Sequence, residues 1–217
     1  MKLASKMFTL TALAIACSAA SAQQSAPLTV TGNITPPGCT ASMSNDGTFK
    51  YPDIDASTLN DTSGKQLDAL PTSTFSISCL GAAQVAWSIT DNRADSPYWT
   101  DDAGYMGLGK DKDGNKIGEY FLKMSQPVLD STNAFVVYSN NGGVRWDNRE
   151  RNGYMLRRNQ LYTYTYNSGG GDSSILQRGK LFSATMAVYT TIAPKNTLNT
   201  TGAIDLDGSS TINLTYL

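Results

Sequence analysis

The side chains that carry out most enzyme chemistry near neutral pH are scarce in this chain of 217 residues. It contains no histidine, which removes Ser–His–Asp and Cys–His catalysis and most catalytic zinc sites. Two carboxylates alone can still hydrolyse a glycosidic bond. The candidates lie in turn-like sequence, where aspartate commonly caps its own backbone, so we expect a protein that is not an enzyme. These candidates are Asp101, Asp102, Asp111, Asp113 and Glu119.

Two further segments resemble ligand-binding loops. The segment DKDGNKIGEYFL (111–122) begins with alternating oxygen ligands, as a calcium loop does. It has Lys116 where such loops need glycine and Leu122 where they need glutamate. The glycine-rich stretch NSGGGDSS (167–174) lacks the lysine and the helix of a phosphate loop. We therefore expect surface turns at both places, with no metal site and no cofactor.

The segment RWDNRERNGYMLRR (145–158) contains five of the seven arginines of the chain. Arginine and aromatic side chains are frequent at recognition sites for anions, sugars and protein partners. Two interpretations stay open. The segment is either a solvated loop or, together with loop 95–110, a ligand surface. The candidate contacts on that surface are Trp146, Arg145, Arg149 and Arg151.

The composition is that of a folded domain. Apolar residues make up 40% of the chain and charged residues 16%, which is enough apolar surface for a core and too little charge for a disordered tail. The formal net charge of −1 does not favour a polyanionic partner such as a nucleic acid.

The first 22 residues have the features of a secretory signal peptide. Lys2 and Lys6 precede a short apolar run, and ASA (20–22) is a small-x-small cleavage site. The run is well below the roughly 20 residues of a membrane-spanning helix, and no other long apolar run follows. We predict an exported protein without a membrane span, with one domain over residues 23–217. A lipoprotein modified at Cys17 is the alternative.

Cleavage at this site leaves two cysteines, Cys39 and Cys79. In an exported protein such a pair predicts a disulfide, which would close a loop of about 40 residues. The chain-entropy model assigns roughly 4 kcal/mol to a loop of this length. Two free buried thiols are the less favoured alternative, and two cysteines without histidine do not make a usual zinc shell.

The rest of the mature chain predicts β-strands almost throughout. Apolar and polar residues alternate with a period of two, and turn-rich pieces separate the runs. Asp46-Gly47 lies between two such runs within 41–54 and predicts a hairpin of two strands over these residues. Many short strands at this spacing favour an antiparallel β-sandwich. The expected strands are 28–34, 73–81, 84–91, 118–124, 134–139, 161–167, 179–194 and 202–216, the last with a break near Gly208.

Three stretches together resemble the subunits of chaperone–usher fimbriae, in particular a branch of fimbria-associated exported bacterial proteins. LTVTGNITPPGC (28–39) matches the N-terminal stretch of a pilin that leads into its first cysteine, and FSISCLG (75–81) matches the strand with the second. Gly202 precedes the penultimate Tyr216 by fourteen residues, which is the pilin spacing.

The resemblance implies an immunoglobulin-like sandwich that lacks its seventh strand. A periplasmic chaperone would lend a strand to the open groove, and the N-terminal extension of another fimbrial subunit would replace it at an outer-membrane usher. The protein would pass through the periplasm to the cell surface and become part of a fimbrium. The residues expected at the chaperone and donor-strand interface are Gly202, Ile212, Leu214 and Tyr216.

One feature bears on the place of the subunit in the fibre. If the first strand is 28–34, only QQSAP (23–27) precedes it in the mature chain, which spans at most about 18 Å. A subunit with so short an extension accepts a strand but donates poorly, as a tip or terminating subunit would. The alternative function is that of a stand-alone periplasmic or surface β-sandwich protein that binds a carbohydrate or receptor.

Overall fold

The computed structural model describes residues 29–33, 38–150, 153–166 and 176–217, with the side chains of 148–150 left out. Two units separate within the chain, Met1–Ile34 and Thr35–Leu217. The described part of the first unit contains no strand. The expected signal peptide and the glycine-rich stretch 167–174 lie outside the described residues.

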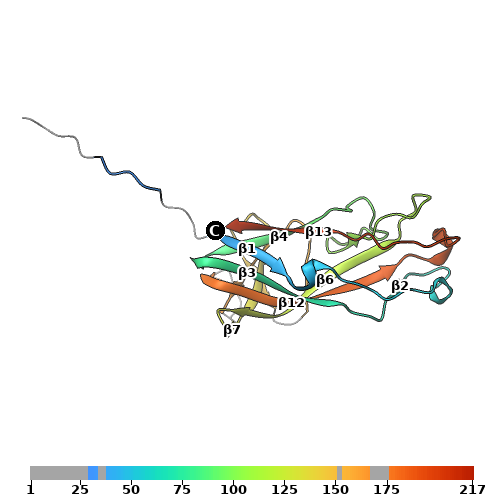
Figure 1. Ribbon diagram of the computed structural model, residues 1–217, viewed down its shortest axis with the longest axis horizontal. Coiled ribbons are helices and arrows are strands. Elements are labelled where there is room, and N and C mark those ends of the chain that lie inside the picture. Colours follow the sequence, from blue (N-terminus) through green and yellow to red (C-terminus); the bar gives the residue numbers. More distant parts are fainter. Residues whose placement is uncertain (1–28, 34–37, 151–152, 167–175) are drawn as a thin grey trace, which may run out of the picture. The chain divides into compact units, whose positions relative to one another are not determined.

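The second unit is built from two antiparallel sheets that pack as a β-sandwich, which confirms the predicted all-β class (Figure 1). In the first sheet three short strands flank a path of five. The path runs β1 (Cys39–Met43), β3 (Thr72–Ala83), β12 (Gly179–Ile192), β6 (Gly118–Leu129) and β10 (Tyr154–Met155), with β2 (Lys65–Gln66) on β12 and with β5 (Met106–Gly107) and β7 (Thr132–Asn133) on β6.

The second sheet has five strands, and short 3₁₀ turns complete the described elements. The strand order is β13 (Ser210–Tyr216), β4 (Val85–Asp91), β11 (Leu161–Thr165), β8 (Phe135–Ser139) and β9 (Asp147–Glu150). The 3₁₀ turns are η1 (Ser44–Gly47), η2 (Ala56–Thr58) and η3 (Lys195–Thr197).

Alternation of apolar residues along the strands produces the core between the sheets. In β12 the even-numbered residues from Phe182 to Ile192 are buried, whereas the odd-numbered ones are half-buried or exposed. Aromatic rings fill the centre of the core. The Trp87 ring stacks on Tyr162 at a centroid distance of 4.6 Å and lies 5.1 Å from the ring of Phe75. The contact between Phe75 on β3 and Trp87 on β4 joins the inner faces of the two sheets.

The N-terminal part of the fold departs from the sequence prediction. The first strand begins at Cys39, and the described residues 29–33 of the predicted strand 28–34 form no strand. Asn45 and Asp46 adopt positive φ, so a turn lies where the hairpin was predicted. The hairpin itself is wrong, because residues 48–55 beyond the turn form no strand.

The C-terminal strand is shorter than predicted. β13 starts at Ser210, although Ile204 and Leu206 continue the alternation and are half-buried. Gly208 marks the predicted break, and its backbone passes close to an aromatic ring. A Cβ atom at this position would lie 2.9 Å from Cε1 of Tyr120. Only glycine allows the chain to approach the ring so closely.

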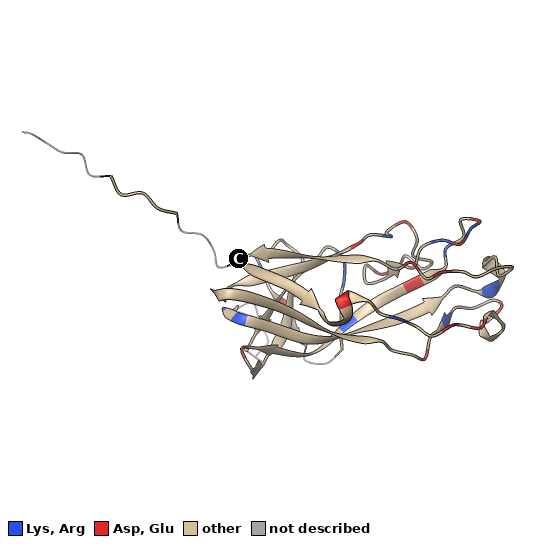
Figure 2. Ribbon diagram, viewed as in Figure 1, with Lys and Arg blue, Asp and Glu red and all other residues tan. Residues whose placement is uncertain are grey.

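Many charged residues lie in the loops at the right-hand end of the view, and the strands carry few of them (Figure 2). This distribution agrees with a sandwich whose strands serve mainly as packing elements. Within the part of the chain that the structure describes, no helix is long and apolar enough to span a membrane.

A disulfide links Cys39 to Cys79, as the sequence predicted. The two residues face each other across the β1–β3 pair, so the bond fixes the start of β1 to its neighbour. β1 pairs with no other strand among the described elements, and it spans five residues. The disulfide is therefore the main covalent support of this edge of the sheet.

We predict that the double variant Cys39→Ala/Cys79→Ala loses about 4 kcal/mol of unfolding free energy, because the disulfide closes a loop of 40 residues. Urea denaturation of the oxidised protein and of the variant measures this loss. A reducing agent should lower the stability of the wild type to the level of the variant and leave the variant unchanged. Equal stability of the oxidised wild type and the variant would contradict the prediction.

Candidate functional site

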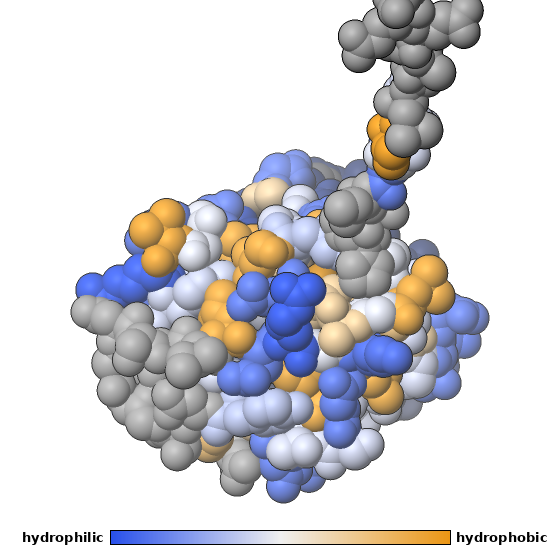
Figure 3. All heavy atoms as spheres, turned by 90° about the vertical axis from the view of Figure 1, so that its left-hand side faces the viewer, coloured by the Kyte–Doolittle hydropathy of each residue, from blue (hydrophilic) through white to orange (hydrophobic). Residues whose placement is uncertain are grey.

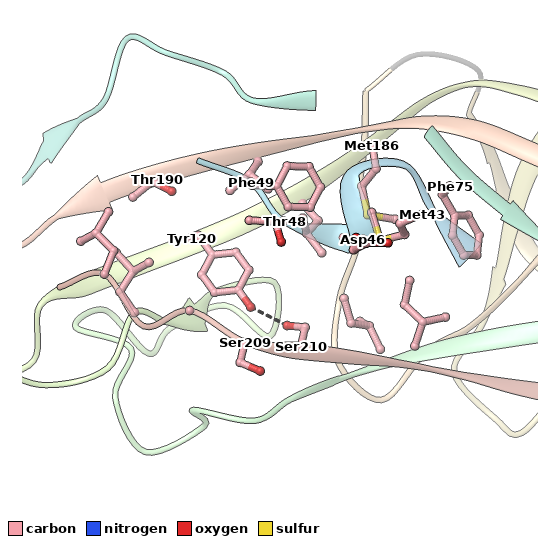
Figure 4. A pocket seen from close by; sticks show the side chains of 18 of the residues that line it. Met43, Asp46, Thr48, Phe49, Phe75, Tyr120, Met186, Thr190, Ser209 and Ser210 are labelled. Atoms are coloured by element: carbon pink, nitrogen blue, oxygen red, sulfur yellow. Dashed lines mark hydrogen bonds between the residues drawn. The ribbon is translucent and has the colours of Figure 1, made fainter. Parts of the chain in front are cut away.

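The two sheets end in edge strands on the same side of the sandwich. Among the described strands, β1 pairs only with β3 and β13 pairs only with β4. Between these edges lies a cavity of about 790 Å³. Its floor consists of buried core residues, among them Phe75, Ile89 and Met186, and Met43 and Ile212 belong to its two walls. Figure 4 shows Met43, Phe75 and Met186 of the first sheet and Ser210 of the second around the cavity.

A second cavity of about 130 Å³ continues the first. It lies between residues 54–59 and 198–206, and the two cavities share Leu206. We call the combined depression between the 39–59 and 198–216 segments the groove. Its main cavity falls within the roughly 300–1,000 Å³ of typical ligand sites.

The groove is the place where the core is incompletely covered. The apolar residues that pack against the core but remain half-buried come almost entirely from its two walls. Tyr138 is the one exception. The others are Cys39, Ala41, Met43, Phe49, Tyr51, Ile54, Leu59, Leu198, Ile204, Leu206, Ile212 and Leu214.

The edge strands beside the groove lack the features that usually prevent a sheet from pairing with another chain. Natural sheets protect their edges with charged residues, proline or bulges. β1 reads CTASM and β13 reads STINLTY, so neither contains a charged residue or a proline. Their pairing with β3 and β4 also runs in unbroken register, without a bulge. Both edges are therefore suited to accept a further strand.

The structure brings three of the four predicted interface residues together on β13. Ile212 and Leu214 are half-buried and pack against the core. Tyr216 is 43% exposed, and its hydroxyl accepts a hydrogen bond of 2.8 Å from the backbone N–H of Cys39. This contact ties the two edge strands together at one end of the groove.

The fourth predicted residue, Gly202, lies outside β13. It lines the smaller cavity, is exposed, and has no atom within 4 Å of the position that a Cβ would take. No contact in the described structure therefore requires glycine at this position.

A second polar contact crosses the groove near its middle. The hydroxyl groups of Tyr120 on β6 and Ser210 on β13 lie 2.5 Å apart, as the dashed line in Figure 4 shows. Burial raises the pKa of Tyr120 to about 12, so the phenol keeps its proton at neutral pH. The hydrogen bond therefore holds the start of β13 against the first sheet.

Apolar side chains also reach the surface near the end that Tyr216 closes. Figure 3 views the molecule from this side and shows orange apolar residues between blue polar ones. The exposed fractions are 88% for Leu80, 45% for Leu181 and 43% for Leu217. Leu80 lies near the end of β3, Leu181 near the start of β12, and Leu217 directly follows β13.

The arginine-rich segment 145–158 does not present Trp146 on a ligand surface, as one of the two interpretations of the sequence required. Trp146 is only 5% exposed, packs with Ala86 and Val137, and donates its indole N–H to the carbonyl oxygen of Gly143. It is a packing residue and cannot serve as an exposed contact. Arg145 forms a surface ion pair with Asp147 at 2.9 Å.

Two further arginines of that surface cannot be placed. Arg149 lies in β9, but its side chain is outside the described part, and Arg151 lies outside the described residues.

The calcium-like segment begins with a turn that hydrogen bonds to the side chain of Asp111 stabilise. The carboxylate of Asp111 accepts hydrogen bonds from the backbone N–H groups of Asp113, Asn115 and Asn199. Burial acts against the charged form, yet these hydrogen bonds hold the pKa of Asp111 at about 2. Among the described residues no group of three or more cysteines and carboxylates is placed to hold a metal ion.

Two of the other acidic candidates have opposite environments. Asp102 forms an ion pair with Arg157 at 2.8 Å, which lowers the pKa of its carboxyl group. Glu119 is only 4% exposed, and burial raises its pKa to about 7, with a smaller contribution from the charge of Asp101. The backbone N–H of Trp99 donates a hydrogen bond of 3.3 Å to this carboxylate.

Comparison with known proteins gives a partial match. Residues 28–106 match a family model described as a protein of unknown function, DUF1120. The matched region contains both cysteines of the disulfide and the strands β1, β3 and β4. No curated protein matches the chain.

The raised pKa of Glu119 makes stability depend on pH. The folded state holds this proton up to about pH 7, whereas the unfolded chain releases it near 4.5. The stabilisation is therefore present below about pH 4.5 and is lost as the pH rises to about 7. We predict that Glu119→Gln removes this dependence, so that its stability relative to the wild type increases by up to about 3 kcal/mol from pH 4 to pH 8.

Denaturation of both proteins at several pH values measures this effect. The carboxyl group of Asp111 contributes mainly below pH 4, because its pKa lies near 2, and is common to both proteins. Parallel stability curves for the wild type and the variant between pH 4 and pH 8 would show that Glu119 has an ordinary pKa.

Proposed function

We propose that the protein is a structural subunit of a chaperone–usher fimbria, assembled by donor-strand complementation. The observation that carries the proposal is the groove between two unpaired and unprotected edges, β1 and β13. An extended segment in this groove would form main-chain hydrogen bonds along an edge and place alternate side chains into the cavity, which is the β-augmentation mode of recognition.

Insertion of a strand would also complete the core. The half-buried apolar residues of the two groove walls would lose contact with water, and each square ångström of apolar surface removed contributes about 25 cal/mol. The subunit alone would be less stable than its complex. This difference supports a periplasmic chaperone as the first partner, with the usher and other subunits as later ones.

The position of β1 changes the interpretation of the N-terminus. Since the first strand begins at Cys39, residues 23–38 would precede it in the mature chain. This stretch contains apolar or small residues at alternate positions, Leu28, Val30, Gly32 and Ile34, and Val30 is 89% exposed. The short extension that favoured a tip or terminating subunit is thus replaced by a segment with the pattern of a donor strand.

The length of this segment also suits the groove. Seven residues, 28–34, extend over about 23 Å, and β13 has seven residues as well. We therefore propose that the subunit both accepts a strand and donates one, so that it occupies a position inside the fibre.

We predict that a synthetic peptide of residues 27–35 binds to the oxidised protein and raises its melting temperature. At a peptide concentration 100 times the dissociation constant, ligand binding stabilises a folded protein by about 2.7 kcal/mol. A peptide with Val30→Asp should lose the effect, because a charge would enter the apolar groove. A peptide with Thr31→Asp should keep it, since residue 31 faces away from the groove in the same strand.

The outcome that contradicts strand acceptance is an unchanged melting temperature with the native peptide. Equal effects of the two aspartate peptides would show that binding does not depend on alternation and therefore does not take place by strand insertion.

A mixing experiment tests assembly with complete chains. The Val30→Asp chain should accept a strand but not donate one, and an Ile212→Asp chain should donate but not accept. After refolding together, we expect the two variants to form a one-to-one complex in size-exclusion chromatography with light scattering, although each alone stays monomeric. A Thr31→Asp chain is the matched control and should assemble as the wild type does. Monomers in the mixture of variants and in the wild type would refute the assembly.

A further inference from the structure

Four exposed apolar side chains surround the point where the N-terminal stretch joins the sandwich. The exposed fractions are 88% for Leu80, 45% for Leu181 and 43% for both Tyr216 and Leu217. Single exposed leucines are normal on a protein surface, whereas a group of apolar residues at one place points to an interaction site. We call these four residues the end patch.

One peptide group connects the two sides of the end patch. The carbonyl oxygen of Gly38 accepts a hydrogen bond of 2.9 Å from the backbone N–H of Leu80. The N–H of the same peptide group, which belongs to Cys39, donates a hydrogen bond of 2.8 Å to the hydroxyl of Tyr216. The C=O and N–H of a trans peptide point in opposite directions. The chain therefore enters the sandwich between Leu80 and Tyr216.

Leu181 extends the end patch along the first sheet. It is the cross-strand partner of Ser78, two residues before Leu80, and all three side chains are exposed on the outer face. Diagonal neighbours of this kind lie about 7–8 Å apart, which is within reach of long side chains. Leu217 directly follows Tyr216 at the edge of the second sheet.

In the proposed assembly a second copy of the chain lies next to the end patch. Segment 28–34 of the donating subunit occupies the groove of the accepting subunit, whereas Gly38 is bound to the β3 strand of the donating subunit itself. The four steps from Ile34 to Gly38 span at most about 14 Å. Pro36 and Pro37 restrict this connection further, because their φ angles are fixed. The accepting subunit is thus kept close to the end patch of the donating one.

We propose that the end patch of each donating subunit packs against the subunit that accepts its strand. This inference rests on the proposed function and adds a second contact between neighbouring copies. Four side chains are too few for the roughly 1,000 Å² that an independent interface buries. The short connection removes this requirement, because it converts the second contact into an intramolecular one. The contact then covers apolar surface that the isolated subunit exposes.

The end patch is separate from the groove of its own subunit. None of its four residues lines either cavity. The groove acts when a subunit accepts a strand, whereas the end patch acts when the same subunit donates one. Loss of the patch should therefore weaken donation, and it should leave the binding of a free donor peptide in that subunit's own groove unchanged.

Dissociation rates of defined pairs test the proposal. The Val30→Asp chain is immobilised as acceptor, and the Ile212→Asp chain is the donor, compared with a free peptide of residues 27–38. We expect the donor chain to dissociate more than tenfold more slowly than the peptide, because only the chain carries the end patch. Leu80→Ser in the donor chain should raise its dissociation rate about fivefold, since the contact covers part of this side chain. Leu181→Ser should act in the same direction.

Leu70→Ser in the donor chain is the matched control. Leu70 is exposed to 43% and precedes β3, whereas Leu80 lies near the other end of that strand. This donor should dissociate as the parent donor does. The melting temperature of each donor alone establishes that it is folded.

Two results would overturn the end patch as a contact. They are equal dissociation rates of the donor chain and the peptide, and equal rates of the Leu80→Ser and Leu70→Ser donors. In both cases strand insertion itself would stand, because the donors still bind. If neither the peptide nor the donor chain binds the acceptor, strand insertion is refuted, and the contact that depends on it is refuted as well.

Discussion

The unpaired edges of β1 and β13 are the constraint on which the rest of the structure depends. The inner strands of each sheet have a hydrogen-bonded neighbour on both sides, and some of these pairings are long, such as that of β12 with β6. At the groove the same two sheets have no strand to close them, and the half-buried apolar residues that pack against the main core lie there almost exclusively. The seam between β1 and β13 is thus the place where this core is incompletely covered, and it is bordered by main chain that pairs on one side only.

One disulfide and two hydrogen bonds stabilise the two edges of the groove. The disulfide fixes the start of β1 to β3, Tyr216 contacts Cys39, and the hydroxyl of Tyr120 contacts Ser210. These contacts tie the walls of the groove together at defined positions without filling it. The groove is thus preorganised in the isolated chain, which lowers the ordering cost of any binding to it.

The sequence predicts local structure well and non-local neighbours poorly. Alternation located most strands, and the cysteine pair located the disulfide, because both signals are short-range or chemically unique. The start of the first strand was missed because 28–34 alternates as clearly as a strand does, whether or not a partner exists in the same chain. Trp146 was misplaced because burial depends on Ala86 and Val137, which the sequence does not connect to it.

The pairing of β13 with β4 has a consequence for the order of folding. Ile212 faces Ile89, and Tyr216 contacts Cys39 across 177 positions of the chain. β4 is synthesised long before β13, so one side of its ladder has no partner during that time. Pairings of such high sequence separation form slowly and leave strand edges exposed to aggregation. The second sheet can therefore be completed only when the last strand is available, and until then the free edge of β4 is exposed.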